Sequence, residues 1–513
     1  MTLARRSRRS RLTATSAVGL MAVAGAVTTA SPAAAAPQCN TAEALMACVT
    51  EEGLVEHLEA LQAIADANDG NRASGTEGYD DSADYVVGRL EAAGYTVTRQ
   101  VFDFAFYELV GTPTLARTAP STTPTTYVYG EDFQDMSYSG SGAVNGAVVP
   151  VDVASTTSGC ETEDFDTLVF PEGSIALLKR GSCDFAVKAA NAEAAGAAAA
   201  IIYNDGVPSP DEDRTTLIGG TLGGPGVTIP VYDTTFALGD EWANTADLTL
   251  SLAIQTVSET RTTENLIAEL PGRKSNDVVA LGAHLDSVPE GPGINDNGTG
   301  TAGILEVAES LAGVQLENTV RFLWWGAEES GLIGSQYFVD SLSQQEISHI
   351  GAYLNFDMIG SPNWARFVYD GDGSDFDAPK GFVTPGSADI EHLFETFYDE
   401  LGVPHEDTAF DGRSDYEAFA LAGIPSGGLF TGAEDPKSPE QQALYGGTAG
   451  LAFDPCYHSA CDDISNVNVD ILDESADAIA YAVITLAGQP RPGAGTGNRP
   501  ADVGQGAGLA PVA

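Results

Sequence analysis

Apolar and polar positions between residues 277 and 485 predict strands and helices that follow one another in turn. Continuous apolar runs, which are typical of buried strands, lie at 277–284, 319–329, 349–360 and 424–430. Apolar residues at helical spacing lie at 301–313, 387–401 and 476–488. Because strands and helices alternate, we expect a three-layer α/β/α fold whose central sheet is mostly parallel.

The N-terminal part of the chain adds two helices and a strand to this pattern. Amphipathic helices are predicted over 53–67 and 80–94, and an alternating strand is predicted over 95–104. A stretch rich in Thr and Pro at 111–127 then marks a boundary. The alternating strand pattern of the first part resumes only near residue 260.

The block between these parts predicts a separate, β-rich α+β domain. Its pattern indicates strands over 146–153 and 173–181 and a helix over 185–205. The simplest account is a second domain inserted into the first. The expected boundaries are 37–112 and 259–488 for the first domain and 113–258 for the inserted one.

Both ends of the chain differ from the folded parts. Residues 1–36 contain five arginines, an apolar stretch and a run of small residues ending in alanines, which is typical of an export signal that the mature protein lacks. A membrane helix is the alternative, but the apolar stretch is short and rich in Ala and Thr. Residues 7–12 also fit a twin-arginine signal, so we expect a secreted protein exported by either route. Residues 489–513, rich in Gly, Pro and Ala, are expected to be disordered.

The chain is strongly acidic. It has 23 basic and 73 acidic residues and a net charge of −50, and loss of the five signal arginines makes the mature chain more negative still. Such a surface repels phosphate backbones and anionic lipids, so we expect neither a nucleic acid nor a membrane as partner. The charge also serves solubility, and we expect a monomer.

Six cysteines in an exported chain indicate disulfides rather than a metal cluster. They lie in three local pairs, Cys39 with Cys48, Cys160 with Cys183, and Cys456 with Cys461. Six cysteines allow 15 pairings, and closeness in the sequence makes these three the leading hypothesis. The third pair would close a small loop around Tyr457 and His458 and fix the direction of both side chains.

Acidic residues and histidines cluster where the predicted strands end. They are His284, Asp296, Glu328, Glu329 and Asp357, and a further histidine, His458, lies in the cysteine-bracketed loop. In an open α/β sheet such strand ends meet at one edge. Taken singly, a strand-end histidine is usually structural, a strand-end aspartate usually caps a helix, and a glutamate pair suits a helix start. Together they would crowd several carboxylates at one place, which repulsion disfavours unless cations are present.

A pair of divalent cations would remove this repulsion. The carboxylates of Asp296, Glu329 and Asp357 together with a hydroxide balance the charge of two such ions. Imidazole nitrogens and carboxylate oxygens suit zinc, with manganese or cobalt as substitutes. If each ion takes one histidine and one terminal carboxylate, with Asp296 between them, Glu328 is left to accept a proton from an activated water. These residues therefore predict metal-assisted hydrolysis.

Six short motifs surround these residues. They are AHLDS (283–287), GINDNGTG (293–300), WWGAEESGLIGS (324–335), NFDMIG (355–360), DGRSDY (411–416) and CYHSAC (456–461). In order and spacing this series resembles the M28 metallopeptidases, and most closely the secreted streptomycete-type leucine aminopeptidases with two cocatalytic zinc ions. The resemblance covers about residues 53–108 and 260–487. It implies that the substrate is the N-terminus of a peptide or protein.

The resemblance also implies a ligand set for each metal. His284 and Asp357 would bind one zinc ion, Glu329 and His458 would bind the other, and Asp296 would bridge the two.

Other residues would act on the substrate or on the ligands. By the same resemblance, Glu328 would be the general base and acid, and Tyr457 would donate a hydrogen bond to the oxyanion of the tetrahedral intermediate. Asp286 would orient the imidazole of His284. The residues implied to line the pocket for a large apolar side chain such as leucine are Met358, Gly412, Arg413 and Phe430.

Two further likenesses concern parts outside the site. Residues 173–205 resemble the protease-associated (PA) domain of aminopeptidase Y-like and receptor-like M28 proteins, where it is a lid or binding module; a spacer is the alternative. Asp473 and Asp477 resemble positions that help to bind a structural calcium ion in streptomycete relatives, but the N-terminal partner residues of that site do not match clearly, and ordinary acid spacing on a helix is the favoured explanation.

Several other functions stay open at this point. A dizinc centre would also serve a carboxypeptidase, and M28-type glutaminyl cyclases use one zinc ion. A non-catalytic binding protein that acts through the inserted domain is a third possibility. The presence of all five ligand positions and of Glu328 favours a two-metal aminopeptidase over these.

Overall fold

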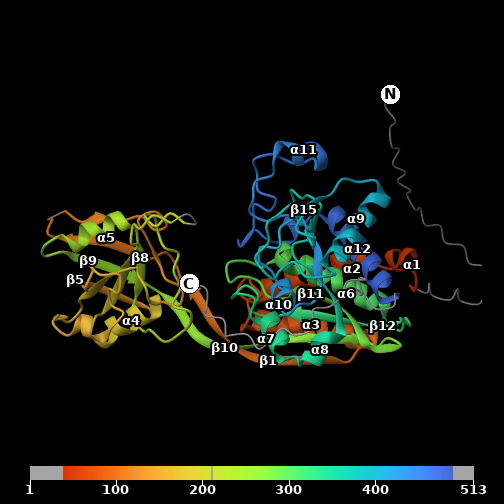
Figure 1. Cartoon of the computed structure of the whole chain (residues 1–513), viewed down its shortest axis with the longest axis horizontal. Helices are drawn as coiled ribbons and strands as arrows, with labels where there is room; N and C mark the ends of the chain where they lie inside the picture. The colour runs from red at the N-terminus through yellow and green to blue at the C-terminus, as the bar shows by residue number, and fades with distance from the viewer. Residues whose placement is uncertain (1–38, 122, 210–211, 489–513) are drawn as a thin grey trace, which may run out of the picture. The chain divides into compact units, whose positions relative to one another are not determined.

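The computed structural model describes residues 39–121, 123–209 and 212–488 (Figure 1). The export signal predicted over 1–36 and the tail predicted over 489–513 lie outside the described residues, and both stay predictions. Among the helices of the described residues, none combines the length and apolar character that a membrane span requires.

The first sheet has eight strands among the described residues. They are β1 (Val97–Leu109), β10 (Thr256–Leu270), β11 (Lys274–His284), β12 (Asn318–Trp325), β13 (Ile350–Phe356), β14 (Phe367–Tyr369), β15 (Glu406–Thr408) and β16 (Ser426–Phe430). Their order is β1-β10-β12-β11-β13-β16-β14-β15. The central run from β12 to β16 is parallel, and antiparallel pairs lie toward the edges. The prediction of a mostly parallel central sheet is confirmed.

Helices cover both faces of this sheet. One face packs against α1 (Ala42–Met46), α2 (Glu51–Ala67), α3 (Glu77–Ala93), α6 (Gly300–Leu311), α9 (Ser387–Leu401) and α12 (Val469–Gly488). The other packs against α7 (Ile333–Ser341), α8 (Gln344–His349) and α10 (Tyr416–Leu421). Successive residues of β11 alternate between the two cores, with Leu281 in the first and Ala280 in the second. The result is the three-layer α/β/α fold that the sequence predicts.

Threonine caps explain where the first long helices begin. Thr50 and Thr76 are in the extended conformation, and their hydroxyls accept the backbone N–H of Gly53 and Tyr79. Gly94 ends α3 with a left-handed φ of 101°. Both helices therefore start two to three residues before the predicted positions.

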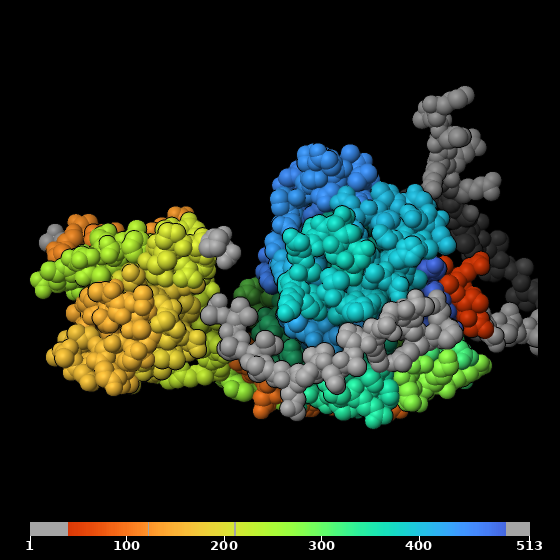
Figure 2. Space-filling view, viewed as in Figure 1, coloured from red at the N-terminus to blue at the C-terminus, as the bar shows by residue number. Residues whose placement is uncertain are grey.

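Helix α11 (Pro439–Tyr445) belongs to a segment that stands out from the sheet layers (Figures 1 and 2). Its Tyr445 packs with Phe367 and Phe453 in a small aromatic cluster. The buried ammonium of Lys437 donates hydrogen bonds to the carbonyl oxygens of Trp364 and Gly446. These contacts anchor the chain just before the cysteine-bracketed loop.

A second sheet, with eight strands in the part of the block that the structure describes, lies between β1 and β10 in the sequence. Its strands are β2 (Thr114–Ala119), β3 (Thr125–Thr126), β4 (Phe133–Asp135), β5 (Gly142–Pro150), β6 (Ile175–Lys179), β7 (Ala199–Tyr203), β8 (Val231–Thr234) and β9 (Thr249–Ile254). The order is β3-β2-β9-β5-β6-β7-β8-β4, and β5 to β8 run parallel. Helices α4 (Phe185–Ala194) and α5 (Phe236–Ala243) join different cores, on opposite faces of this sheet. A β-rich α+β architecture is thus confirmed.

One predicted element of this block is wrong. The single helix predicted over 185–205 is α4 followed by strand β7, because Gly196 adopts a φ of 94° just after the helix. Left-handed glycine commonly ends a helix. The apolar residues that follow, including Ile201 and Ile202, are fully buried between β6 and β8.

A long two-stranded ribbon leads into and out of the second sheet. Strands β1 and β10 pair antiparallel from Val97 opposite Ala268 to Leu109 opposite Thr256. The chain therefore leaves the first sheet and returns to it at neighbouring positions. The boundaries expected at 112/113 and 258/259 remain a prediction.

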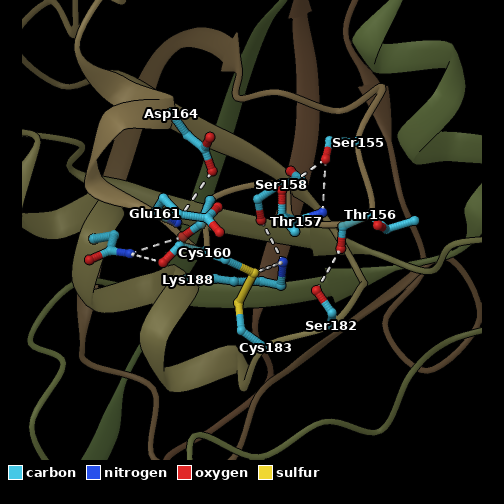
Figure 3. The surroundings of a disulfide bond; sticks show 12 residues. Ser155, Thr156, Thr157, Ser158, Cys160, Glu161, Asp164, Ser182, Cys183 and Lys188 are labelled. Carbon is cyan, nitrogen blue, oxygen red and sulfur yellow. Dashed lines mark hydrogen bonds between the residues drawn. A yellow bond between two sulfur atoms is a disulfide. The ribbon is translucent and has the colours of Figure 1, made fainter.

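The structure contains three disulfides. They join Cys39 to Cys48, Cys160 to Cys183, and Cys456 to Cys461, the pairing expected from closeness in the sequence. Figure 3 shows that Lys188 of α4 points toward the second disulfide, where its Nζ lies 3.6 Å from the Cys160 sulfur and donates to the Ser158 carbonyl oxygen. Burial lowers the pKa of Lys188 to about 8.

Candidate metal centre

The candidate ligands meet at the carboxyl ends of three adjacent strands. His284 is the last residue of β11, and Glu328 and Glu329 follow the end of β12 by three and four residues. Asp357 directly follows β13, on the other side of β11. Asp296 lies in η2 (Ile294–Thr299), the single turn that leads into α6. The sheet thus gathers residues from four separate stretches of sequence.

Asp296 lies between the two histidines. Its Oδ1 is 3.2 Å from Nε2 of His284, and its Oδ2 is 3.2 Å from Nε2 of His458. His284 Nε2 is also 3.3 Å from Asp357 Oδ1, and His458 Nε2 is 3.0 Å from Glu329 Oε2. Two ligand sets that share Asp296 result, and the donor atoms within each set lie within 4.8 Å of one another.

The donor atoms fit a pair of divalent transition metals. Within the described residues, Oε1 of Glu329 is buried and accepts no hydrogen bond, and buried Oδ1 of Asp357 accepts none either, although it lies 3.3 Å from Nε2 of His284. A buried carboxylate oxygen without a partner is costly, and coordination to a cation would satisfy it. One imidazole and carboxylate oxygens in each set match the preferences of zinc.

The electrostatics of the cluster indicate a shortage of positive charge. Burial raises the pKa of Glu328 well above its usual range, although His284 opposes the shift. Burial and the neighbouring Asp296 raise the pKa of Glu329 to about 8. Burial would raise the pKa of Asp296 too, but hydrogen bonds from both histidines lower it. Burial opposes protonation of His458, yet its hydrogen bonds to Asp296 and Glu329 raise its pKa to about 10. Bound cations would remove this imbalance.

Asp286 contacts the imidazole of His284, but mainly through its backbone. Nδ1 of His284 lies 3.0 Å from the carbonyl oxygen of Asp286 and 3.7 Å from its Oδ1. The same Oδ1 accepts the backbone N–H of Glu328 at 3.3 Å. Asp286 therefore links the first histidine to the backbone of the glutamate pair.

Three residues that support the ligands were not predicted. The hydroxyl of Ser414 donates to Oδ2 of Asp357 at 2.6 Å. The carboxylate of Asp462 accepts the backbone N–H groups of Asn295 at 2.9 Å and Asp296 at 3.0 Å. The position of Asp462 directly after Cys461 was a usable signal, as was the place of Ser414 within the DGRSDY motif.

The third residue is Arg72, which is fully buried. Its guanidinium donates to the carbonyl oxygens of Pro292 at 2.9 Å, Gly293 at 2.6 Å and Leu285. Its backbone N–H also donates to the Ser287 hydroxyl at 2.9 Å. Arg72 thereby holds both ends of the loop 285–293, which connects His284 to the Asp296 turn.

Three residues at the centre have left-handed backbone conformations without being glycine. They are Ala327, Met358 and His458, with φ of 55°, 50° and 52°. Each is a candidate ligand or directly adjoins a residue of the cluster, so the backbone turns sharply where these side chains point inward. Such outliers are unfavourable and concentrate at functional sites.

A pocket of about 410 Å³ opens onto the cluster. All four residues predicted to receive the substrate side chain line it, namely Met358, Gly412, Arg413 and Phe430. Tyr457 lines it too, and its ring stacks on that of His458 with centroids 3.8 Å apart. Arg413 donates to the Tyr457 hydroxyl at 3.4 Å and to Glu434 at 2.8 Å.

Asp473 and Asp477 lie one turn apart on α12. Burial raises the pKa of both carboxyls, with Glu51 adding to the effect at Asp473 and Asp473 itself adding to it at Asp477. Calcium at this position stays a prediction.

Comparison with known proteins assigns both parts of the chain to known families. The model of peptidase family M28 matches residues 265–483, and that of the PA domain matches residues 144–242. An aminopeptidase of Pseudomonas aeruginosa is 48% identical over 453 residues, covering 87% of this chain and 83% of that protein. Leucine aminopeptidase 2 of Trichophyton tonsurans is 41% identical over 435 residues, covering 84% and 83%.

Solved structures agree with these sequence relatives. The aminopeptidase from Aneurinibacillus sp. strain AM-1 superposes with a TM-score of 0.62 at 26% identity, covering 87% of this chain and 96% of that one. A zinc aminopeptidase from Bacillus subtilis superposes with a TM-score of 0.56 at 26% identity, covering 86% and 96%. From its sequence relatives, its family match and its fold, the chain belongs to peptidase family M28 and carries a PA domain.

Proposed function

We propose that this protein is an extracellular dizinc aminopeptidase that removes N-terminal residues from peptides, with a preference for large hydrophobic residues such as leucine. The observation that carries the proposal is the pair of histidine–carboxylate sets that share Asp296 at the floor of the pocket. The aminopeptidase names of the sequence relatives and the zinc of the Bacillus enzyme support it. Three disulfides suit an oxidising, extracellular environment.

Each zinc ion would be held by one half of the cluster. His284 and Asp357 would hold the first ion, Glu329 and His458 the second, and Asp296 would contribute one oxygen to each. When bound, the two ions supply Lewis-acid polarisation of the substrate carbonyl and lower the pKa of water toward neutrality.

Glu328 is the acid–base residue of this proposal. It is buried at the wall of the pocket, and its Oε2 lies 4.0 Å from Nε2 of His284. It belongs to neither of the two ligand sets that share Asp296, so its carboxylate can accept a proton from the attacking water. The same carboxyl then returns the proton to the leaving amine.

Tyr457 would stabilise negative charge on the substrate. Burial and the carboxylates of Asp296 and Glu329 raise the pKa of its hydroxyl above its usual range, so the hydroxyl keeps its proton at neutral pH. It can therefore donate a hydrogen bond to the oxyanion that forms on the scissile carbonyl.

The lining of the pocket supports the proposed preference for a large hydrophobic residue at the substrate N-terminus. Met358 and Phe430 supply apolar wall, and Gly412 leaves room beside the ring of Phe382, which a larger residue at 412 would overlap. Burying an apolar side chain contributes about 1.5–3 kcal/mol. A leucine side chain at the substrate N-terminus would gain this energy, and a charged one would not.

The proposal is tested with the anilides of leucine, lysine and proline and with N-blocked leucine anilide. We expect rapid release from free leucine anilide, none from the blocked compound, loss of activity on chelation and recovery with two equivalents of zinc. Cleavage of the blocked substrate would exclude an aminopeptidase, and activity with one equivalent of zinc alone would exclude the dizinc assignment.

The role of Glu328 has its own test. Glu328→Gln should lower kcat about 10³-fold while two zinc ions stay bound, because it removes the proton acceptor and no ligand. Glu290→Gln, an exposed position in the 285–293 loop, is the matched control and should keep full activity. A Glu328→Gln protein with more than a tenth of the wild-type kcat contradicts the assignment.

A further inference from the structure

The turn that carries the glutamate pair begins in an unfavourable backbone conformation. Ala327 directly precedes Glu328 and Glu329, and its φ is 55°. Residues other than glycine rarely adopt this left-handed conformation, because their Cβ comes too close to the following carbonyl oxygen. Such a residue persists where the surrounding structure holds it in place. The contacts around Ala327 therefore decide where the two glutamates point.

Strand β10 supplies the first of these contacts, beyond the place where its pairing with β12 stops. The pairing runs as far as Leu266 opposite Trp324. The next side chain along β10, that of Asn265, then bonds to the turn: its Oδ1 accepts the backbone N–H of Gly326 at 3.2 Å, and its Nδ2 donates to the carbonyl oxygen of Gly334 at 2.8 Å. Both ends of the turn are thus attached to one strand.

Ser74 adds a second support from the loop between α2 and α3. Its hydroxyl oxygen accepts the backbone N–H of Ala327 at 2.6 Å and the hydroxyl of Thr263, also on β10, at 3.3 Å. Ser74 and Thr263 are each only 3% exposed. A hydroxyl oxygen has two acceptor lone pairs, and these two donors occupy both of them. The direction of the Ser74 oxygen toward Ala327 is therefore fixed.

We propose that Ser74 is a positioning residue for the glutamate pair, acting through the backbone of Ala327. By holding Ala327 in its left-handed conformation, it sets the directions in which the next two side chains leave the turn. Glu328 lines the pocket, and Oε2 of Glu329 reaches within 3.0 Å of Nε2 of His458. This inference rests on the proposed function, because it gives Ser74 a part in the reaction assigned there to Glu328 and the zinc ions.

The place of Ser74 predicts unequal effects on the two candidate ligand sets. Glu329, two residues after Ala327, belongs to one set. His284 and Asp357 of the other set lie at the ends of β11 and β13, outside the turn. A hydroxyl that served only the stability of the fold would affect both sets alike. Loss of a positioning hydroxyl should loosen the set that contains Glu329 and spare the other.

Zinc binding tests this expectation without reference to activity. The full-length wild type and Ser74→Ala are titrated with zinc in competition with a chelating dye, which gives an affinity for each ion. Ser74→Ala should weaken one ion about 10- to 100-fold and leave the other within about threefold of wild type. Glu329→Gln identifies the affected ion, because it alters the ligand itself. In the Glu329→Gln background, Ser74→Ala should not weaken the remaining ion further.

Steady-state kinetics with leucine anilide gives a second readout. Ser74→Ala should lower kcat about 10- to 100-fold and leave KM nearly unchanged, since a small displacement of a catalytic group has an effect of this size. Thr263→Val removes one donor to Ser74 and keeps the shape of the side chain, so it should lower kcat by less. Ser82→Ala is the matched control, because Ser82 is buried and its hydroxyl donates to the Gly78 carbonyl oxygen within α3. It should keep the wild-type kcat and both zinc affinities.

The outcomes separate this role from the proposed function. A wild type that binds fewer than two zinc ions would refute the dizinc assignment and, with it, the role of Ser74. A wild type that binds two ions, with zinc affinities and kcat unchanged in Ser74→Ala, would overturn the role of Ser74 alone, and so would equal weakening of both ions. Should Ser74→Ala fail to fold, a wild-type kcat in Thr263→Val would overturn the proposal.

Discussion

Replacing the buried Arg72 by methionine should damage the candidate metal centre without changing any candidate ligand. The guanidinium holds three backbone carbonyls at the two ends of the loop 285–293. This loop begins directly after His284 and ends just before the turn that carries Asp296. Loss of the guanidinium would leave the buried carbonyl oxygens of Leu285 and Pro292 without this donor and that of Gly293 with only the backbone N–H of Gly298, and it would free the spacing between the two candidate ligands.

The size of the effect follows from two opposing terms. Hydrogen bonds from a charged donor contribute about 1.5–3 kcal/mol each, so three of them amount to roughly 6 kcal/mol. Burial, however, lowers the pKa of Arg72 from 12.5 to about 10 against the attraction of Asp286 and Asp462. At about 1.4 kcal/mol per pKa unit, removing the buried charge returns roughly 3 kcal/mol. We therefore expect Arg72→Met to lower the free energy of unfolding by about 3 kcal/mol.

The assay is urea unfolding followed by tryptophan fluorescence, together with zinc affinity from competition with a chelating dye. Loosened supports of metal ligands typically cost 10- to 100-fold in affinity, and we expect a loss of that size. Arg273→Met is the control, because the Arg273 side chain is 67% exposed and, among the described residues, forms an ion pair with Glu317 alone. It should change the free energy of unfolding by less than about 0.5 kcal/mol.

Arg72→Lys should lower the free energy of unfolding by less than Arg72→Met and by more than Arg273→Met. One ammonium cannot reach all three carbonyls that the fixed geometry of a guanidinium reaches. A destabilisation by Arg72→Met below 1 kcal/mol, with zinc affinity unchanged, would refute the idea that Arg72 positions the loop.

Two further predictions, which use three substitutions, test other parts of the fold. The pKa of Lys188 is about 8 in the folded protein and 10.5 when exposed, so the unfolded chain binds more protons between these pH values and stability rises with pH. Urea unfolding should show a free energy of unfolding about 2 kcal/mol higher at pH 9.5 than at pH 7.5, and Lys188→Met should lack this rise. An equal rise in both proteins would disprove the role of Lys188. Gly300→Ala would place a Cβ in overlap with the carbonyl oxygen of Phe356, next to Asp357. It should lower the free energy of unfolding by more than about 2 kcal/mol and should lower kcat/KM. Gly88→Ala, whose Cβ meets nothing within 4 Å on α3, should stabilise by up to about 1 kcal/mol; equal effects of the two alanines on stability would contradict the packing argument.

The strand-end rule explains why much of the centre can be predicted. His284, Glu329 and Asp357 follow apolar runs that could only be buried strands, and parallel strands bring their carboxyl ends to one edge. His458 follows no strand. Its place became predictable only through the two cysteines that bracket it.

The supports of the ligands are harder to predict. Arg72 binds backbone carbonyls, and since every residue has a carbonyl group, no sequence pattern marks its partners. Asp286 acts on His284 largely through its own carbonyl oxygen, which a side-chain argument cannot foresee. The helix predicted over 185–205 failed for another reason, because alanine favours helices while burial within a sheet decides the outcome. Gly196 was the available signal for the break.

The ribbon formed by β1 and β10 bears on how this architecture could have arisen. Leu109 and Thr256 are cross-strand partners, so the whole intervening block enters and leaves through one hairpin end. In an ancestor, a two-residue turn at that place would have closed the hairpin without disturbing any ladder hydrogen bond below it. Modules could thus be gained, lost or exchanged there during evolution while the catalytic half kept its register.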